Sequence, residues 1–502
     1  MSSTTGFFLA FDQSTSATKT MLFTPDGRLL DQETIPHDQI YPQAGWVEHD
    51  AEEIYNNTLN AASTILKRHP DKINNLLALS ITNQRETFVL FDRETGQPLY
   101  NAIVWQCRRG DDICRLLVAE GKDDIVHGLT GLKIDTYFPP SKLSWLLNTK
   151  PDLRNRLKDG SALFGTMDTY LIYRLTSGKV YATDHTNASR TLFYDIEKLA
   201  WSRELCELFG LQFNALPEVR ESTAWYGDTD LAGSLNRRIP ICGVMGDSQA
   251  AMFAQRCFLP GDVKVTFGTG SSILMNIWHE KRLSKKATLT ALAWVLEGQP
   301  TYAFEGIINF TGAIVAWLRD QMQIIDSPAE TETLANSVMD SDGVYFIPAF
   351  VGLSAPYWRA DARAAILGMT PSTTRAHIVR AALESIGYIV TAVLKAMSKD
   401  AGVSLDTVYA DGGAVCNAFL MQFVSDMNQI NLRVSRLPEL SALGAVLNGG
   451  IGLKIYKSFT DLRKISAGFV EFNPKLDPID ANDRFEGWQS AVEQVLNQHP
   501  KG

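Results

Sequence analysis

The segment Phe7–Phe23 reads FFLAFDQSTSATKTMLF. Its apolar start, Phe7–Phe11, predicts a strand buried on both faces, and Asp12 follows directly. The small or polar residues Gln13–Thr18 predict a turn and Met21–Phe23 a second strand, so the segment reads as a hairpin. Small side chains let successive N–H groups of such a turn face phosphate oxygens, and a carboxylate beside it suits Mg²⁺. An ordinary hairpin with a Ser/Thr-rich turn is the alternative.

A second segment of the same kind lies further along the chain. Asp262–Asn276, DVKVTFGTGSSILMN, again places a turn of small residues between two apolar strands. Two such hairpins indicate two similar domains, each presenting a phosphate-binding loop to one cleft. Beyond them, Val408–Ala410 predicts a short strand, Asp411–Gly413 a turn and Asn417–Met427 a helix. Glycines at a turn from strand to helix allow the backbone close to a ligand.

Strands and helices alternate in the N-terminal part of the chain. Asp50 is a suitable N-cap for a helix whose apolar residues recur along one face. Leu76–Ile81 and Phe88–Phe91 predict strands, with residues 83–86 (NQRE) exposed between them. This alternation predicts an α/β protein.

Four side chains of this part are candidates for holding a hydroxylated ligand. Arg85 and Glu86 could donate to and accept from neighbouring hydroxyls, although such a dipeptide is usually a surface ion pair. Trp105 could form an apolar wall for the carbon face of a polyol, or pack in the core. Tyr137 could add a hydroxyl nearby, or simply pack.

A further carboxylate stands at the end of a predicted strand in Ile239–Ala250, IPICGVMGDSQA. Asp247 in this position could accept the proton of a hydroxyl that attacks a phosphoryl group. It could equally cap the helix predicted to follow, and both roles are compatible.

Composition narrows the classes of protein. A chain of 502 residues predicts two or three domains, and the boundary is expected near Pro260-Gly261. A net charge of −9 without a Lys/Arg-rich run argues against binding nucleic acid. No uninterrupted apolar stretch would cross a bilayer and no signal peptide is visible, so no membrane insertion is expected. The scattered cysteines indicate free thiols in a reducing cytoplasm rather than a metal site.

Several longer strings identify a family resemblance. They are residues 40–42 (IYP), 45–50 (GWVEHD), 81–87 (ITNQRET), 100–109 (YNAIVWQCRR), 183–191 (TDHTNASRT) and 216–220 (LPEVR). With the three elements above, they make the chain similar to the FGGY family of carbohydrate kinases from about Phe7 to Trp488. Within that family, the resemblance is strongest to the members that phosphorylate glycerol.

The resemblance implies two actin/hexokinase-like (ribonuclease H-like) domains with a catalytic cleft between them. Residues 1–258 would form the substrate-side domain and residues 259–502 the nucleotide-side domain. The implied activity is ATP- and Mg²⁺-dependent phosphorylation of a terminal hydroxyl of a small polyol, with glycerol 3-phosphate as the first expected product. The resemblance also implies a homodimer or homotetramer.

The resemblance assigns roles residue by residue. It makes Asp247 the catalytic base, and Asp12 and Asp247 the residues that hold the metal. The implied substrate-binding residues are Arg85, Glu86, Trp105, Tyr137, Asp247, Ser248 and Ser272. The implied nucleotide-binding residues are Thr15, Ser16, Ala17, Lys19, Thr269, Gly312, Ala316, Gly413 and Asn417.

Two substrate positions depart from the pattern of the glycerol-phosphorylating members. Ser248 replaces a glutamine and Ser272 replaces an aromatic residue, which predicts a larger and more hydrophilic pocket. A kinase for erythritol, threitol, xylitol, xylulose or ribulose is therefore the alternative. On the nucleotide side, Lys19 replaces an arginine and Ala316 a glutamine. An ATP-binding sensor without catalytic activity is a lesser alternative, against which the presence of Asp12 and Asp247 counts.

Overall fold

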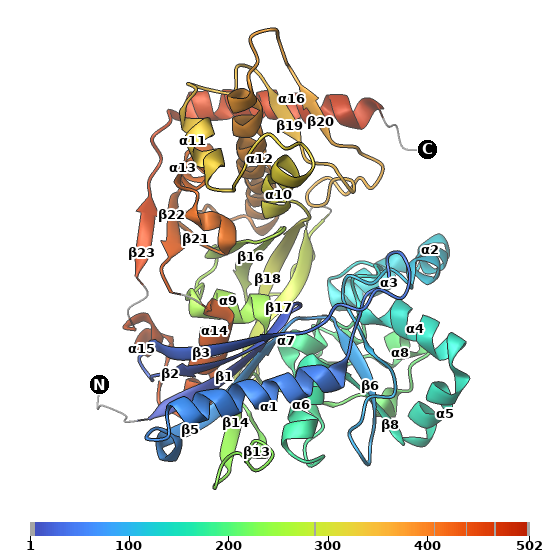
Figure 1. Cartoon of the computed structure of the whole chain (residues 1–502). Helices are drawn as coiled ribbons and strands as arrows, with labels where there is room; N and C mark the ends of the chain where they lie inside the picture. The colour runs from blue at the N-terminus through green and yellow to red at the C-terminus, as the bar shows by residue number, and fades with distance from the viewer. Residues whose placement is uncertain (1–5, 286–287, 406, 438, 466–467, 499–502) are drawn as a thin grey trace.

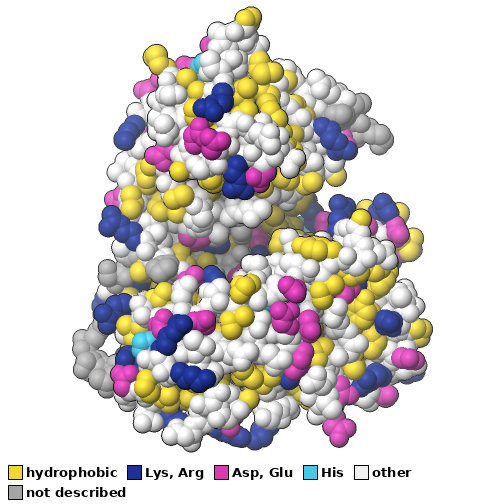
Figure 2. All heavy atoms as spheres, viewed as in Figure 1, with side chains coloured by type: hydrophobic (Ala, Val, Ile, Leu, Met, Phe, Trp, Pro, Cys, Tyr) yellow, Lys and Arg dark blue, Asp and Glu magenta, His cyan; other side chains and the backbone are white. Residues whose placement is uncertain are grey.

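This computed structural model describes residues 6–285, 288–405, 407–437, 439–465 and 468–498. The chain forms two lobes, with most of its N-terminal half in the lower lobe of Figure 1 and most of its C-terminal half in the upper lobe. Figure 2 shows a hollow between them. Each lobe contains a mixed β-sheet covered by helices, so the predicted two-domain α/β fold is confirmed.

A six-stranded sheet organises the lower lobe, in the order β13-β14-β5-β1-β2-β3. Strands β1 and β2 form the predicted first hairpin, and β1 also pairs in parallel with β5. The alternation of strands with helices allows this parallel pairing. The strands are β1 Phe7–Gln13, β2 Ala17–Phe23, β3 Leu29–Pro36, β5 Leu76–Asn83, β13 Trp225–Thr229 and β14 Ile239–Gly246.

A seven-stranded sheet organises the upper lobe, in the order β17-β18-β16-β15-β21-β22-β23. Its antiparallel hairpin β15-β16 and parallel strands β21 and β22 correspond to β1-β2, β5 and β14, so the two sheets share one plan. The strands are β15 Val263–Phe267, β16 Ser271–Trp278, β17 Leu289–Leu296, β18 Gln299–Ile308, β21 Thr407–Asp411, β22 Asn431–Ser435 and β23 Phe469–Phe472.

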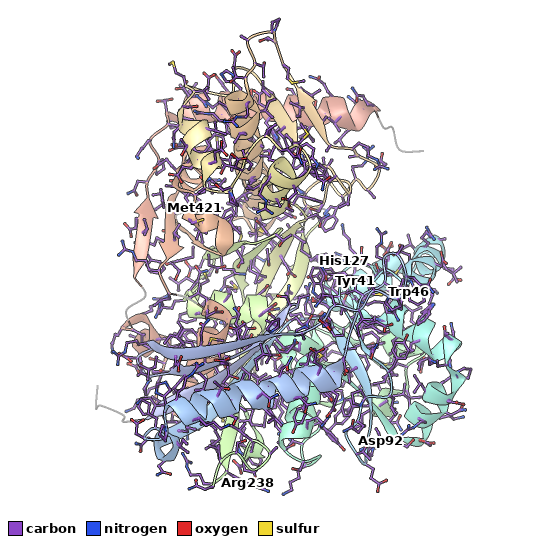
Figure 3. The ribbon with its side chains drawn as sticks, in the orientation of Figure 1. Tyr41, Trp46, Asp92, His127, Arg238 and Met421 are labelled. Carbon is purple, nitrogen blue, oxygen red and sulfur yellow. The ribbon has the colours of Figure 1, made fainter. Side chains whose placement is uncertain are left out.

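Smaller sheets extend both lobes. A four-stranded sheet of the lower lobe consists of β4 Glu48–His49, β7 Ala102–Ile103, β6 Phe88–Asp92 and β8 Ala162–Thr166. The two-stranded pairs are β9 Ala182–Asp184 with β12 Glu218–Arg220, β10 Tyr194–Asp195 with β11 Ala200–Trp201, and β19 Tyr345–Ile347 with β20 Ala365–Leu367. Figure 3 shows Tyr41, Trp46 and His127 at the edge of the lower lobe towards the gap.

The helices of the lower lobe surround its sheets, and α1 begins as predicted, because the Asp50 side chain accepts the N–H groups of Glu52 and Glu53. They are α1 Ala51–Arg68, α2 Asp111–Ala119, α3 Asp123–Thr130, α4 Pro139–Thr149, α5 Pro151–Asp159, α6 Met167–Leu175, α7 His185–Ala188, α8 Arg203–Phe209 and α9 Asp247–Ala254, with the 3₁₀ turns η1 Ile73–Asn75 and η2 Phe213–Ala215.

The C-terminal half contributes the remaining helices. They are α10 Gly312–Asp320, α11 Glu330–Asn336, α12 Arg375–Ala401, η3 Gly413–Cys416, α13 Ala418–Asn428, α14 Leu440–Gly452, α15 Phe459–Arg463 and α16 Pro478–Gln498. Helix α14 lies against β14 and α9 of the lower lobe (Figure 1). A Cβ atom on Gly444 would lie 1.8 Å from the carbonyl oxygen of Ala250, so this approach requires glycine. The predicted boundary between residues 258 and 259 falls between α9 and β15 and stays a prediction.

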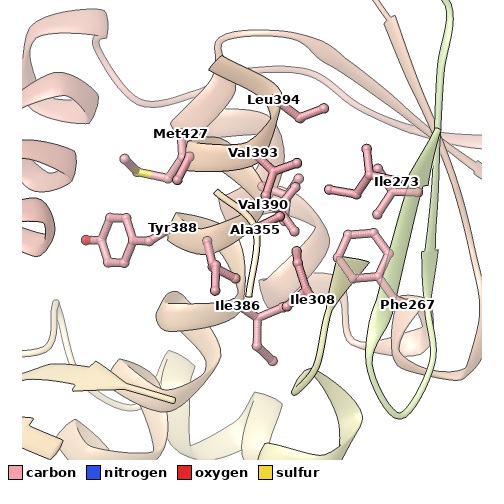
Figure 4. Close-up of a cluster of buried hydrophobic side chains, with 14 of the residues drawn as sticks. Phe267, Ile273, Ile308, Ala355, Ile386, Tyr388, Val390, Val393, Leu394 and Met427 are labelled. Atoms are coloured by element: carbon pink, nitrogen blue, oxygen red, sulfur yellow. The ribbon is translucent and has the colours of Figure 1, made fainter. Parts of the chain in front are cut away.

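Helix α12 packs on the sheet of the upper lobe. Its Ile386, Val390 and Val393 meet Phe267 and Ile308 in one buried cluster (Figure 4). Within the described ranges, α12 is also the one helix long and apolar enough to cross a membrane by length and composition. Because 83% of its most apolar stretch is buried inside the protein, it is a core helix.

Candidate active site

A cavity of about 530 Å³ opens between the two hairpins. Lys19 of β2 lines it from the first hairpin, and Thr266 of β15 from the second. Asp247 and Ser248, at the start of α9, and Gly413, after β21, complete this part of its wall. The structure therefore brings the three predicted ligand-binding elements to one cavity, although they are far apart in the chain.

The first hairpin turn is held by side chains from neighbouring loops. The carbonyl oxygen of Thr15 accepts hydrogen bonds from Gln39 Nε2 at 2.7 Å and from the His37 ring at 2.9 Å. Its hydroxyl accepts the indole N–H of Trp105 at 3.0 Å. Ser16 is exposed at the tip of the turn. Three hydrogen bonds from other segments thus hold Thr15 in place.

Asp12 lies at the end of β1, beside this turn. Burial raises its pKa to about 7, Lys19 opposes the shift, and Glu439 and Asp247 add to it. Lys19 is paired, because its ammonium lies 2.7 and 2.9 Å from the two carboxylate oxygens of Glu439. Asp247 thus adds to the cost of charging Asp12, and a divalent cation would offset this cost, so Asp12 and Asp247 fit Mg²⁺.

Arg85 and Glu86 are buried, so the prediction that they are exposed was wrong. Arg85 donates to Glu305 at 2.9 Å, whereas its Nε lies 3.8 Å from Glu86. Glu86 accepts the Nε–H of Arg190 at 2.6 Å, and Arg190 also donates to Glu305. Two guanidinium groups thus balance two carboxylates in the interior. Glu305 comes from the upper lobe and its partners from the lower lobe, so this network joins the two.

Asp247 faces the cavity, and its side chain is 39% exposed. Its carboxylate accepts the N–H of Ser248 at 2.6 Å and lies 3.3 Å from Nε of Arg85. Gly246 is the N-cap of α9 and Asp247 its first residue, so the predicted capping role of Asp247 was wrong. An ionised carboxylate is favoured at a helix N-terminus and can accept a proton from a hydroxyl in the cavity.

Trp105 and Tyr137 lie together, with ring centroids 5.2 Å apart, and Tyr137 is close enough to Arg85 to act on it electrostatically. The buried ammonium of Lys142 binds the segments that carry them. It donates to the carbonyl oxygens of Val104, Trp105 and Tyr137 at 3.1, 3.4 and 3.3 Å. The two aromatic residues are therefore held side by side, but neither lines the cavity described above, and their role as a surface for a polyol stays a prediction.

Ser248 and Ser272, both predicted to bind substrate, are in contact, with hydroxyl oxygens 3.5 Å apart. Ser248 is at the start of α9, and Ser272 is on β16, opposite Thr266. The sequence predicted that these two substitutions act at the same place. The structure brings them together.

The predicted nucleotide-binding residues come from several elements. Thr269 and Gly312 lie next to each other, because Gly312 N–H donates to the Gly268 carbonyl and Ala313 N–H to the Thr269 carbonyl. The side chain of Asn417 accepts the Leu420 N–H and donates to Thr331, so it caps α13. Of the predicted nucleotide residues, Lys19 and Gly413 line the cavity described above, and Thr15, Ser16, Ala17, Thr269, Gly312, Ala316 and Asn417 do not.

Three residues of the charged network were not predicted. Gln249 accepts from Arg85 at 3.3 Å, and Arg190 and Glu305 are described above. A signal existed for Glu305, because it is the one charged residue of β18, QPTYAFEGII, whose other residues are mostly apolar. Arg190 lies in the string NASR, which contributed to the family resemblance, but no role was predicted for Arg190 itself.

Comparisons with known proteins place the chain in a family. The FGGY family of carbohydrate kinases matches with its N-terminal domain over residues 7–254 and its C-terminal domain over residues 263–453. The chain is 46% identical over 490 residues to a glycerol kinase of Symbiobacterium thermophilum, covering 98% of both chains. It is 42% identical over 492 residues to glycerol kinase 1 of Thermotoga maritima, covering 98% of this chain and 100% of that protein.

The structure also matches a solved structure over nearly the whole chain. A crystal structure of Plasmodium falciparum glycerol kinase with ADP superposes with a TM-score of 0.94, at 35% identity and 98% coverage of both chains. These matches confirm the resemblance and the fold. The protein belongs to the FGGY family of carbohydrate kinases.

Proposed function

We propose that this protein is an ATP-dependent kinase that transfers a phosphoryl group to a terminal hydroxyl of glycerol, giving glycerol 3-phosphate. Full-length similarity to several glycerol kinases supports this substrate. The observation that carries the mechanism is the position of Asp247. Its carboxylate opens to the cavity between the two hairpins and lies 3.3 Å from Arg85 of the charged network.

In the proposed reaction, the carbon chain of the acceptor packs beside Trp105 and Tyr137, and its non-reacting hydroxyls hydrogen-bond to Arg85 and Glu86. Asp247 accepts the proton of the reacting hydroxyl. The hydroxyl oxygen bonds to the γ-phosphorus as the bond from this phosphorus to the β–γ bridging oxygen breaks, and ADP leaves with the electron pair. Movement of the two lobes towards each other would exclude water and limit hydrolysis of ATP.

Mg²⁺ belongs to this proposal as the cofactor. Asp12 and Asp247 would hold it or its water ligands, and the bound ion would neutralise charge on the phosphate oxygens. The buried position of Asp12 supports this role, because its charge is costly without a cation nearby.

A larger polyol or ketose is the second candidate substrate. Ser248 and Ser272 support it, because the two hydroxyls lie together, 3.5 Å apart, and serine at both positions leaves more space around them than a glutamine and an aromatic residue would. Erythritol, threitol, xylitol, xylulose and ribulose each carry the additional hydroxyl-bearing carbons that such space would accept. A catalytically inactive ATP-binding sensor is less well supported, since Asp12 and Asp247 are both present.

We also propose a cytoplasmic location and a homodimer or homotetramer. Six free cysteines agree with a reducing compartment. Light scattering after size exclusion would measure the oligomeric state.

A coupled ADP-release assay with ATP and Mg²⁺ tests the substrate. The panel contains glycerol, the two tetritols, xylitol, xylulose and ribulose. We expect glycerol to give the highest kcat/KM. A longer substrate that exceeds glycerol by more than about tenfold would assign the changed specificity to the two serines, since hydrogen-bonding pockets discriminate strongly. No turnover with any compound, together with ATP binding, would favour the sensor.

A further inference from the structure

Lys264 is a buried cation in the wall of the cavity that the mechanism above does not use. Its residue is 1% exposed and lies on β15, shortly before the phosphate-binding turn of the second hairpin. Side chains two residues apart on a strand share one face, so Lys264 and Thr266 point to the same side, and both line the cavity. The neighbouring strand places Asp411 opposite Thr266.

The Lys264 ammonium has no direct partner among the residues that the structure describes. No carboxylate oxygen there lies within 4.0 Å of it, although Asp411, Asp247 and Glu305 act on it from a longer distance and Arg85 opposes them. Asp411 is engaged elsewhere, because it accepts hydrogen bonds from Gln255 and Thr266. Burial lowers the pKa of Lys264, which is the cost of keeping an unpaired ammonium inside.

The other basic groups at this place are already compensated. Lys19, the second lysine in the cavity wall, is bound by both oxygens of Glu439. Arg85, in the adjoining network, shares two carboxylates with a second arginine. Among the described residues that line this cavity, Lys264 is therefore the basic residue whose ammonium is not paired with a carboxylate. A buried charge of this kind is costly unless a ligand completes it.

We propose that the Lys264 ammonium contacts the γ-phosphoryl group of the bound nucleotide and stabilises the charge on its oxygens during transfer. The inference rests on the kinase function proposed above and adds a catalytic residue to it. Asp247 and Ser248 line the same cavity, which brings Lys264 to the side where the acceptor hydroxyl attacks. A fixed cation there acts on the phosphoryl oxygens while the bond to the β–γ bridging oxygen breaks and the bond to the acceptor oxygen forms.

The test compares nucleotides with and without a γ-phosphoryl group. Calorimetry would measure the binding of Mg·ADP and of the non-hydrolysable analogue Mg·AMP-PNP to the wild type, Lys264→Met, Lys264→Arg and the exposed control Lys399→Met. For Lys264→Met we expect AMP-PNP to bind at least tenfold more weakly and ADP within threefold of the wild type. We expect kcat to fall about 10²–10³-fold, as on removal of one stabilising donor, and Lys264→Arg to recover part of it.

Stability provides a second readout. Replacing an unpaired buried ammonium with methionine removes a desolvation cost, so the Tm of Lys264→Met should equal or exceed that of the wild type. AMP-PNP binding and kcat within threefold of the wild type would overturn the proposal, as would an equal loss of affinity for ADP and AMP-PNP. If the wild type phosphorylates no polyol but the selective loss of AMP-PNP binding is found, the proposed function fails and the contact of Lys264 stands.

Discussion

Glu305 is the residue whose replacement tests the charged network most directly. It is fully buried and accepts hydrogen bonds from Arg85 and Arg190. The substitution Glu305→Gln keeps the shape of the side chain and removes its charge. The two guanidinium groups then keep one fully buried carboxylate, that of Glu86, besides the partly exposed Asp247 beside Arg85. The amide NH₂ of glutamine can also face one of the two arginines.

The magnitude follows from burial. Breaking a buried ion pair by neutralising one partner costs about 3–5 kcal/mol, because a charge stays buried without compensation. The matched control is Glu471→Gln on β23. The Arg433–Glu471 pair has the same 2.9 Å separation as Arg85–Glu305, but its side chains are 35% and 46% exposed. An exposed pair of this kind contributes at most about 1 kcal/mol.

Urea unfolding followed by circular dichroism would measure both variants beside the wild type. We expect Glu305→Gln to lose about 3–5 kcal/mol of unfolding free energy and Glu471→Gln less than about 1 kcal/mol. The loss of stability caused by Glu305→Gln should persist at high salt, whereas the smaller loss caused by Glu471→Gln should shrink, since salt screens exposed pairs far more than buried ones. A loss below 1 kcal/mol for Glu305→Gln would refute the reasoning, because the network would then be compensated by other groups.

Two further predictions concern the catalytic base and acid stability. Asp247→Asn should lower kcat by about 10²–10⁴-fold and leave ADP affinity within threefold, and turnover near the wild-type rate would show that another group takes the proton. His49 is fully buried, and burial lowers its pKa to about 3. The unfolded chain therefore binds a proton near pH 6.5 that the folded protein excludes, so the stabilising difference is complete above pH 6.5 and is lost towards pH 3. Between pH 7.5 and 5, unfolding free energies should fall by about 2 kcal/mol more in the wild type than in His49→Asn; equal losses would contradict this.

Local patterns in the sequence were sufficient to predict the two hairpins that carry the proposed phosphate-binding turns. The apolar runs and small-residue turns predicted both hairpins, and the structure has them as β1-β2 and β15-β16. The prediction of Asp50 as an N-cap was confirmed for the same reason. The hydrophobic period, the turn residues and the capping residues depend on neighbours in the chain, so they can be predicted from the local sequence.

Arg85 and Glu86 show the limit of local patterns, because they were predicted to be exposed and are buried. A charged dipeptide at a turn is typical of a surface, and the sequence reading placed it there. Its burial depends on Glu305, which is 220 residues from Arg85 in the chain, and on Arg190, which is 104 residues from Glu86. The two charges can be buried only because these distant residues lie next to them in the fold, and a local sequence pattern cannot show that.

The sequence by itself determined the family, the α/β class and the two hairpins, because each depends on motifs or on short-range periodicity. Only the tertiary structure decided which charges are compensated. Lys19 is paired with Glu439, 420 residues away, and Lys264 on its short strand is left without a direct partner among the described residues. The reason is physical: the cost of a buried charge depends on what the fold brings within a few ångströms of it, and that distance is set by the packing of the two lobes.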